Sequence, residues 1–320
     1  MSNGQKGSIG MKSDVIMNRR IRRSVVENIQ LWSMILPTMV LIFIFCYVPM
    51  YGVLIAFQDY LPGMDIIGKN AAKWVGLLQF KTFISSAYFG RIISNTIRLS
   101  FYTLLFGFLV PILFALLVDQ IKRMRFKKFL QTVSYMPHFI STVVVAGMVC
   151  SFVYTDGLIT NFLSVFGLPA QNYRLSSSAF TPIYVVTDIW KSFGWGSILY
   201  VATISSIDPA LYEAAKIDGA NRGQQIWHIT LTGLRPVIAI NLIMSVGGIL
   251  SANSEFILLF YTPNTYDVAD VLGTYINRMG IEGGHYSLTT SAGLFVSAIG
   301  FVLTFTANKI SDWLTGFALW

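Results

Sequence analysis

Two ionisable residues stand three positions apart inside a long apolar run of this sequence. Asp188 and Lys191 lie in the run 180–205, and residues three apart share one face of a helix. Ionisable groups in such a run are costly to bury, so they usually face a cavity or a partner. Aromatic residues flank the pair and would suit a sugar, which offers hydroxyls to polar groups and C–H faces to rings. The alternative is an internal Asp188–Lys191 ion pair, with the rings in lipid or at the interface.

Neighbouring polar and aromatic positions extend this pair into a candidate binding set. Its members are Asp188, Trp190, Lys191, Phe193, Trp195, Asn253 and Glu255. No comparable set indicates catalysis, because the three histidines are scattered along the chain. No metal site is predicted, and no GxxxxGKS or GxxxxGKT run is present to hold a nucleotide. We therefore expect neither a catalytic residue nor a bound cofactor in this chain.

The segment after the run 180–205 predicts two short helices joined by a tight turn. Asp208 is a good N-cap, and Pro209 suits the first helical position because its missing amide would be unpaired there. Gly219 predicts the left-handed residue that ends this helix. Asn221, with Gln224 three residues later, resembles a capping box for the second helix.

The composition indicates which elements position these residues. Of the 320 residues 54% are hydrophobic and only 12% are charged, against about 25% charged in a soluble domain. A membrane crossing needs ~20 mostly apolar residues, and each must be helical because lipid cannot satisfy free backbone amides. Six such runs are present, at residues 34–57, 92–118, 129–154, 180–205, 236–262 and 286–310. The predicted fold class is an all-α membrane protein with six transmembrane helices.

The distribution of Lys and Arg predicts the orientation, since cytoplasmic loops retain basic residues. Fifteen of the 23 lie on the side that holds both termini, six lie on the other side and two lie within runs. Both termini are therefore expected in the cytoplasm, as an even number of spans requires. We divide the chain into an N-terminal tail (1–30), a transmembrane domain (31–312, with the loop 206–235) and a C-terminus (313–320). The basic tail is either an amphipathic helix on the inner surface or disordered.

The loop between the fourth and fifth runs resembles a known signature. It contains Glu213-Ala214-Ala215, then Gly219 after three residues, then Ile229-x-Leu231 after nine more. This spacing is similar to the EAA loop of permease subunits in binding-protein-dependent ABC importers. The family usually has proline directly after that leucine, whereas this chain has Thr232 and reaches a proline only at Pro236, which we expect to open the fifth span.

The resemblance implies a role for this loop. In the family, the first helix of the loop inserts into a groove on a separate ATPase subunit, and Glu213 would make the polar contact there. ATP and Mg would be held by that partner. The positions expected to couple to the ATPase are Tyr212, Glu213, Ala214, Ala215, Asp218, Gly219 and Arg222.

The resemblance also implies an assembly and a cargo. A second homologous permease, an ATPase dimer and an outer solute-binding protein are the expected partners, in the inner membrane of a bacterium. The stretches 253–261, 266–271 and 306–309 are similar to permeases for oligosaccharides released from complex polysaccharides. No nucleic acid is expected, because basic residues at anionic lipid headgroups explain the +8 net charge.

Two alternatives remain beside an oligosaccharide importer. The first is a member of the same family that imports amino acids, peptides or polyamines. The second is a transporter driven by an ion gradient, which would normally be built from inverted repeats with broken helices. The sequence shows no internal repeat, and a gradient-driven carrier needs no helical docking loop.

Overall fold

The computed structural model describes residues 28–250 and 252–319 of the chain. They belong to two compact units, Met1–Leu54 and Ile55–Trp320. The predicted basic tail falls almost entirely on residues 1–27, outside the described part.

The described part of the first unit is an apolar helix without a buried residue from 28 to 54. The apolar helical stretch runs from Asn28 to Phe57 and confirms the first predicted span. A π-helical turn, η1 (Phe43–Tyr47), precedes α2 (Val48–Met50) and the 3-10 helix η2 (Tyr51–Phe57). Pro49 explains this irregularity, because a proline inside a helix removes one hydrogen bond and clashes with the carbonyl four residues earlier.

The described residues of the second unit are mostly helical and include one short antiparallel strand pair. Strand β1 (Gln58–Asp59) pairs with β2 (Lys73–Trp74), so that Gln58 lies opposite Trp74. The α-helices that follow are α3 (Leu78–Ile84), α4 (Phe89–Asp119), α5 (Met124–Tyr135), α6 (Thr142–Phe152), α7 (Leu158–Val165), α8 (Ser177–Ser205), α9 (Pro209–Ile217), α10 (Arg222–Gln225), α11 (Leu231–Gly247), α12 (Ser254–Phe260), α13 (Tyr266–Ala269), α14 (Leu272–Tyr275) and α15 (Tyr286–Thr315). The short 3-10 and π-helical turns between them are η3 (Met136–Phe139), η4 (Tyr173–Leu175), η5 (Ile226–Thr230), η6 (Pro263–Thr265) and η7 (Ile276–Glu282).

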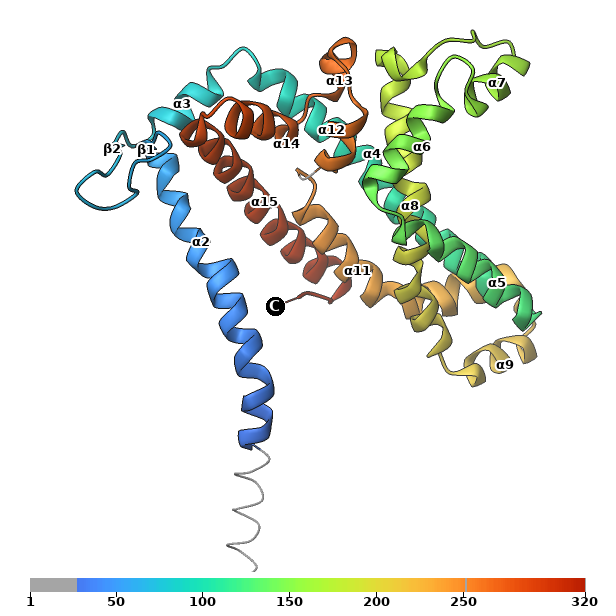
Figure 1. Cartoon of the computed structure of the whole chain (residues 1–320). Helices are drawn as coiled ribbons and strands as arrows, with labels where there is room; N and C mark the ends of the chain where they lie inside the picture. Colours follow the sequence, from blue (N-terminus) through green and yellow to red (C-terminus); the bar gives the residue numbers. More distant parts are fainter. Residues whose placement is uncertain (1–27, 251, 320) are drawn as a thin grey trace, which may run out of the picture. The chain divides into compact units, whose positions relative to one another are not determined.

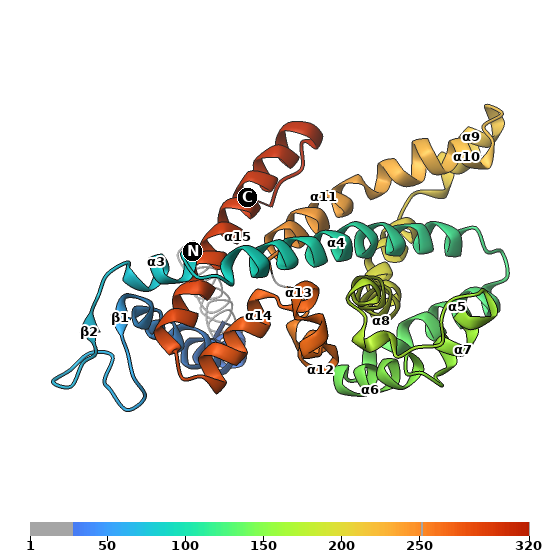
Figure 2. The ribbon, with the colours of Figure 1, turned by 90° about the horizontal axis from the view of Figure 1, so that it is seen from above.

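Close helix contacts in this unit depend on glycine. A Cβ on Gly194 of α8 would lie 1.9 Å from the carbonyl oxygen of Ser134 on α5. A Cβ on Gly247 of α11 would lie 2.4 Å from Oγ1 of Thr304 on α15. The absence of a side chain therefore lets these helices touch. Helices α4 and α8 also pack together, with α8 seen end-on beside α4 in Figure 2.

Two predicted spans are broken in the structure. The run 129–154 forms α5, η3 and α6, with a bend of 98° between the two helical parts. Pro137 is the second residue of η3, and Ile140 after it is extended. Ser141 then caps the start of α6 by accepting a hydrogen bond from the Val144 amide (3.4 Å). A proline and a new N-cap within a few residues explain why one helix becomes two.

The run 236–262 is the second broken span. Helix α11 ends at Gly247, and α12 begins only at Ser254, where Asn253 accepts a hydrogen bond from the Phe256 amide (3.3 Å). Pro236 lies inside α11 and does not open a span, so that expectation is wrong. The helical stretch from Arg222 to Gly247 is continuous, although it contains the π-helical turn η5 and Pro236.

Length and composition identify four helices of the described residues that can cross a membrane. They are Asn28–Phe57, Phe89–Asp119, Arg222–Gly247 and Tyr286–Trp313, and the bent pair α5–α6 counts as a fifth if it is one span. Helix α8 has 29 residues but is not among the four, because its polar residues lower its mean hydropathy. The structure therefore gives four to five candidate spans within its described residues, against the six predicted.

Candidate functional site

The loop after α8 folds as the predicted helical hairpin, which we define as residues 208–230. Asp208 accepts a hydrogen bond from the Ala210 amide (2.9 Å) at the start of α9. Gly219 ends that helix with φ +81°. Asn221 and Gln224 form the capping box of α10 through bonds of 2.8 and 2.9 Å. Figure 1 shows α9 at one end of α8, with α7 at the other.

The base of the hairpin packs on its own chain. The Tyr212 hydroxyl lies 3.0 Å from Oγ1 of Thr230, a residue only 1% exposed. The Ile207 side chain would be 2.7 Å from a Cβ on Gly233, so the two segments touch closely. Tyr212, expected to couple to the ATPase, is therefore half-buried and turned toward its own chain.

The outer surface of the hairpin remains exposed. Glu213, Ala214, Asp218, Gly219 and Arg222 are all exposed, and Ala215 is half-buried. Apolar side chains stand among them: Ile217 is 86% exposed and Trp227 is 68% exposed. An exposed apolar surface rimmed by polar residues is typical of a protein contact site.

A cavity of about 560 Å³ lies between α4, α8, α11 and the break that follows α11. Its wall combines hydroxyl, amide and carboxylate groups with aromatic and small residues. The lining residues are Ser100, Thr103, Leu104, Gly107, Phe108, Pro111, Tyr184, Asp188, Trp195, Gly196, Leu199, Tyr200, Asn241, Ser245, Gly248, Ile249, Ala252 and Asn253. This is the size and mixed character of a small-molecule site.

A polar cluster stands at one wall of the cavity. Asn253 donates from Nδ2 to Oδ1 of Asp188 (3.3 Å) and from its backbone amide to the Tyr184 hydroxyl (3.0 Å). The Ser100 hydroxyl, in a residue 6% exposed, has no hydrogen-bond partner within the described residues. Burying a hydroxyl without a hydrogen-bond partner costs free energy, and a ligand in the cavity that bonds this hydroxyl would recover it.

The predicted binding set divides into two groups. Asp188, Trp195 and Asn253 line the cavity. The other four members do not line it. Trp190 is 38% exposed and Glu255 is also exposed. Lys191 donates from Nζ to Oγ1 of Thr142 (2.8 Å), and the Phe193 ring meets that of Phe114 edge-on, with the ring centroids 5.2 Å apart. Asp188 and Lys191 therefore have separate hydrogen-bond partners.

The other lining residues were missed by the sequence prediction, although a helical repeat marks them. Ser100, Thr103 and Gly107 follow one another at three- and four-residue steps along α4, as Asn241 and Ser245 do along α11. Such spacing places small and polar residues on one face of an apolar helix. Only packing indicates that these faces meet at a single cavity.

Comparison with known proteins identifies the chain. Residues 107–316 match the family described as binding-protein-dependent transport system inner membrane component. The polygalacturonan/rhamnogalacturonan transport system permease protein YteP of Bacillus subtilis is 38% identical over 294 residues, which cover 92% of this chain and 91% of that protein. Protein LplB of the same organism is 38% identical over 283 residues, with 88% of each chain covered. This chain belongs to that permease family.

Two solved structures agree with this identification of the permease. A bacterial ABC transporter involved in the import of the acidic polysaccharide alginate contains a chain with 41% identity and a TM-score of 0.82, which covers 92% of this permease and 99% of that chain. A complex of the alginate transporter with its alginate pentasaccharide-bound periplasmic protein gives 40% identity and a TM-score of 0.83, covering 94% and 100%. The protein is therefore an inner-membrane permease subunit of an ABC importer and not an enzyme.

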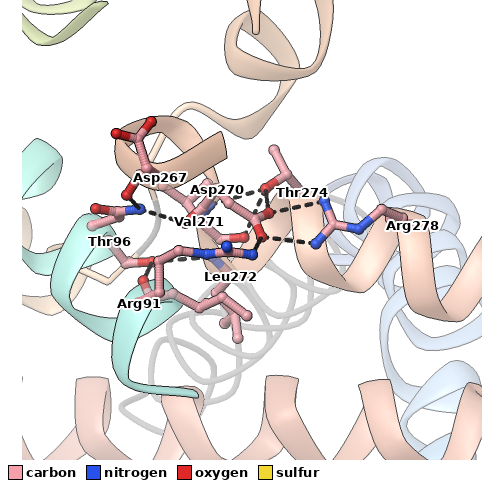
Figure 3. Close-up of polar contacts among 10 residues, drawn as sticks. Arg91, Thr96, Asp267, Asp270, Val271, Leu272, Thr274 and Arg278 are labelled. Carbon is pink, nitrogen blue, oxygen red and sulfur yellow. Dashed lines mark hydrogen bonds and ion pairs between the residues drawn. The ribbon is translucent and has the colours of Figure 1, made fainter. Parts of the chain in front are cut away.

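A buried ion cluster organises the permease near the start of α4 (Figure 3). The Asp270 carboxylate, which is 0% exposed, accepts two bonds from Arg278, at 2.7 and 3.0 Å, and one from Arg91, at 3.1 Å. Thr274 adds a hydroxyl donor at 2.9 Å. Hydrogen bonding to Asp270 raises the pKa of Arg278 above its already high value. Two cations thus surround one carboxylate.

Helix α4 binds the backbone of the segment that carries Asp270. Asn95 donates from Nδ2 to the carbonyls of Asp267 (2.9 Å) and Asp270 (3.2 Å). Thr96 accepts a bond from the Leu272 amide (3.0 Å), a contact drawn in Figure 3. Arg98 donates from its guanidinium to the Val268 carbonyl (3.0 Å). The 267–272 segment is therefore held to α4 by side chains from a single stretch of that helix.

Proposed function

We propose that this permease forms one half of the translocation pathway for an oligosaccharide. The observation that carries the proposal is the cavity, where the Asp188 carboxylate and the unpaired Ser100 hydroxyl stand near aromatic rings. The carboxylate and the hydroxyl can bond sugar hydroxyls, and the aromatic rings can cover the C–H faces of a sugar. The transport of polygalacturonan, rhamnogalacturonan and alginate by similar proteins supports a carbohydrate over amino acids, peptides or polyamines.

The hairpin is the proposed contact with a separate ATPase. Its exposed Glu213 and Ala214, together with the exposed Ile217, support a partner that covers this surface. Glu213 is proposed to make the polar contact, and Gly219 sets the bend that presents α9. Tyr212 is better explained as a brace between α9 and η5, since its hydroxyl meets Thr230. Closure of the ATPase would then move α8 and α11 through the hairpin.

Six crossings are proposed, of which two are broken. Helix 28–57, α4, α8 and α15 would each cross once, and the bent pair α5–α6 and the interrupted pair α11–α12 would supply the remaining two. An even number places both termini on one side, and the basic loops support the cytoplasm for that side. We propose the same division of the chain as above: a tail at 1–30, a transmembrane domain at 31–312 with its loop 206–235, and a C-terminus at 313–320.

A complete importer needs further chains. We propose a second homologous permease, an ATPase dimer that binds ATP and Mg, and an outer solute-binding protein. The periplasmic protein bound to the similar alginate transporter supports the last of these. The permease itself is proposed to bind no cofactor or metal, and to use no residue as a catalyst.

Reconstitution tests this proposal directly. The permease with its partners in vesicles should accumulate a labelled pectin- or alginate-derived oligosaccharide only when ATP and the loaded binding protein are present. The loaded binding protein should also accelerate ATP hydrolysis, whereas amino acids, peptides and polyamines should not compete. Uptake by the permease in an ion gradient without any ATPase would refute the proposal.

Changing Asp188 to Ala tests the role of the cavity. The substitution removes the charged acceptor from the wall, and hydrogen bonds to charged groups contribute about 1.5–3 kcal/mol. Uptake at low substrate concentration should fall about tenfold or more. Glu255→Gln is the matched control, because Glu255 is exposed and does not line the cavity. Equal losses in the two variants would contradict a specific role for Asp188.

A further inference from the structure

A second cavity lies between α11 and α15 and differs from the first in being almost wholly apolar. It measures about 430 Å³, and we call it the α11–α15 groove. Its walls are aliphatic, from Ile238, Leu242 and Val246 on α11 and from Leu303, Ala307 and Ile310 on α15. A groove with aliphatic walls suits a hydrocarbon chain and not the hydroxyls of a sugar.

Arg235 lies at one end of this groove and is the cation of its lining. Arg235, one turn after the start of α11, is exposed and has no ion pair or hydrogen bond among the described residues. The two hydroxyls of the lining already have partners: Thr306 donates to the Val302 carbonyl and Ser311 to the Phe317 carbonyl, both at 2.8 Å. The guanidinium is therefore the free polar group of the groove.

The charge around this end is positive. From residue 222 to 253 the chain has no Asp or Glu, and α15 has only Asp312 against Lys309. Trp313, at the same end of α15, is 84% exposed. Exposed tryptophans gather at the membrane–water interface, which indicates that Arg235 stands at the depth of the lipid headgroups.

The length of the groove agrees with one leaflet. Arg235 and Val246 are eleven residues apart on α11, which corresponds to about 16 Å at 1.5 Å per residue. Half of the ~30 Å hydrocarbon core is about 15 Å. An acyl chain with its headgroup at Arg235 would therefore end near Val246, where the groove also ends.

We propose that the α11–α15 groove binds one acyl chain of an anionic phospholipid whose phosphate pairs with Arg235. The arrangement is that of a basic pocket between transmembrane helices, which suits an anionic headgroup. Because α11 continues from the hairpin without a break, the lipid would contact the same helix that the ATPase is proposed to move. The binding site itself rests only on the membrane location of the permease.

Native mass spectrometry of the assembled importer tests the site. The complex is exchanged into an equimolar mixture of phosphatidylglycerol and phosphatidylcholine, and bound lipids are counted after release from detergent. The wild type should retain phosphatidylglycerol preferentially. Arg235→Gln should weaken that retention about fivefold, the effect of ~1 kcal/mol per basic residue, whereas Arg235→Lys should preserve most of it.

Two further variants separate a built site from general surface charge. Lys309→Gln removes the same charge from α15 outside the groove, where Lys309 lies over the Phe305 ring, and should leave retention unchanged. Ala307→Phe fills the groove and should displace the lipid although Arg235 remains. Equal retention by the wild type and Arg235→Gln, or equal losses in Arg235→Gln and Lys309→Gln, would overturn the proposal. Neither result bears on sugar import, which is measured separately.

Discussion

Replacing Glu213 with Lys should uncouple ATP hydrolysis from import. Glu213 is exposed on α9 and bonds no other residue of the described chain, so the substitution should leave the hairpin folded. A cation there would oppose the polar contact proposed for the ATPase groove. Removing one partner of a buried, hydrogen-bonded charge pair at an interface costs about 2–5 kcal/mol. Import should fall about a hundredfold, which corresponds to ~3 kcal/mol. Uptake and ATP hydrolysis are measured on the same vesicles.

Two controls define this expectation. Glu213→Gln removes the charge without reversing it and should give an intermediate loss. Glu282→Lys makes the same reversal at an exposed glutamate remote from the hairpin, and it should leave coupling intact. Normal import by Glu213→Lys would show that the hairpin does not transmit the stroke of the ATPase through this residue.

Replacing Arg278 with Gln should destabilise the permease strongly. The Asp270 carboxylate would lose both bonds of the paired guanidinium and would keep only Arg91 and Thr274. A buried charge that loses a partner costs about 3–5 kcal/mol, and Asp270 is completely buried. The apparent melting temperature of the purified complex should fall, and import should fall with it as the 267–272 segment separates from α4.

Graded variants at the same cluster test the reason for this loss. Arg91 donates a single hydrogen bond to Asp270 and its side chain is 36% exposed, so Arg91→Gln should cost clearly less. Arg278→Lys should recover only part of the stability, because an ammonium cannot bind both carboxylate oxygens in the same way. Equal effects of Arg91→Gln and Arg278→Gln would contradict the two-point contact as the main source of stability.

Alkaline pH should not imitate the Arg278 variant. Asp270 raises the pKa of Arg278 in the folded state, so the associated stability is present below the pKa of the unfolded state and is lost only when pH rises through the folded value. The pKa of Arg278 lies above mildly alkaline pH in both the folded and the unfolded state. The difference in melting temperature between the wild type and Arg278→Gln should therefore be the same at pH 7 and pH 9.

Local patterns predicted the hairpin correctly because its stabilising contacts are short in sequence. Asp208 bonds the amide two residues later, and Asn221 and Gln224 bond each other across three residues. Gly219 adopts the left-handed conformation that its type favours. The intact spans were predicted for a similar reason, since the requirement for ~20 apolar residues is a property of one continuous stretch.

The breaks in the helices were missed because apolar composition does not report them. The run 236–262 remains apolar through the gap between Gly247 and Ser254, although Asn253 starts a new helix inside it. Pro137 and Ser141 interrupt the run 129–154 in the same way. Hydropathy measures whether a segment belongs in lipid and carries no information on the direction of its backbone.

The sequence by itself determined that this chain lies in a membrane, that it exposes a capped helical hairpin, and that its loop resembles that of an importer permease. Tertiary structure decided which polar residues meet. Asp270 is separated from Arg91 by 179 positions, and the cavity collects residues from three helices, so no local spacing relates them. It also gave Asp188 and Lys191, which lie three positions apart on α8, different hydrogen-bond partners. Burial and packing across the chain select such partners, because a buried charge or amide is stable only where a complementary group from another helix reaches it.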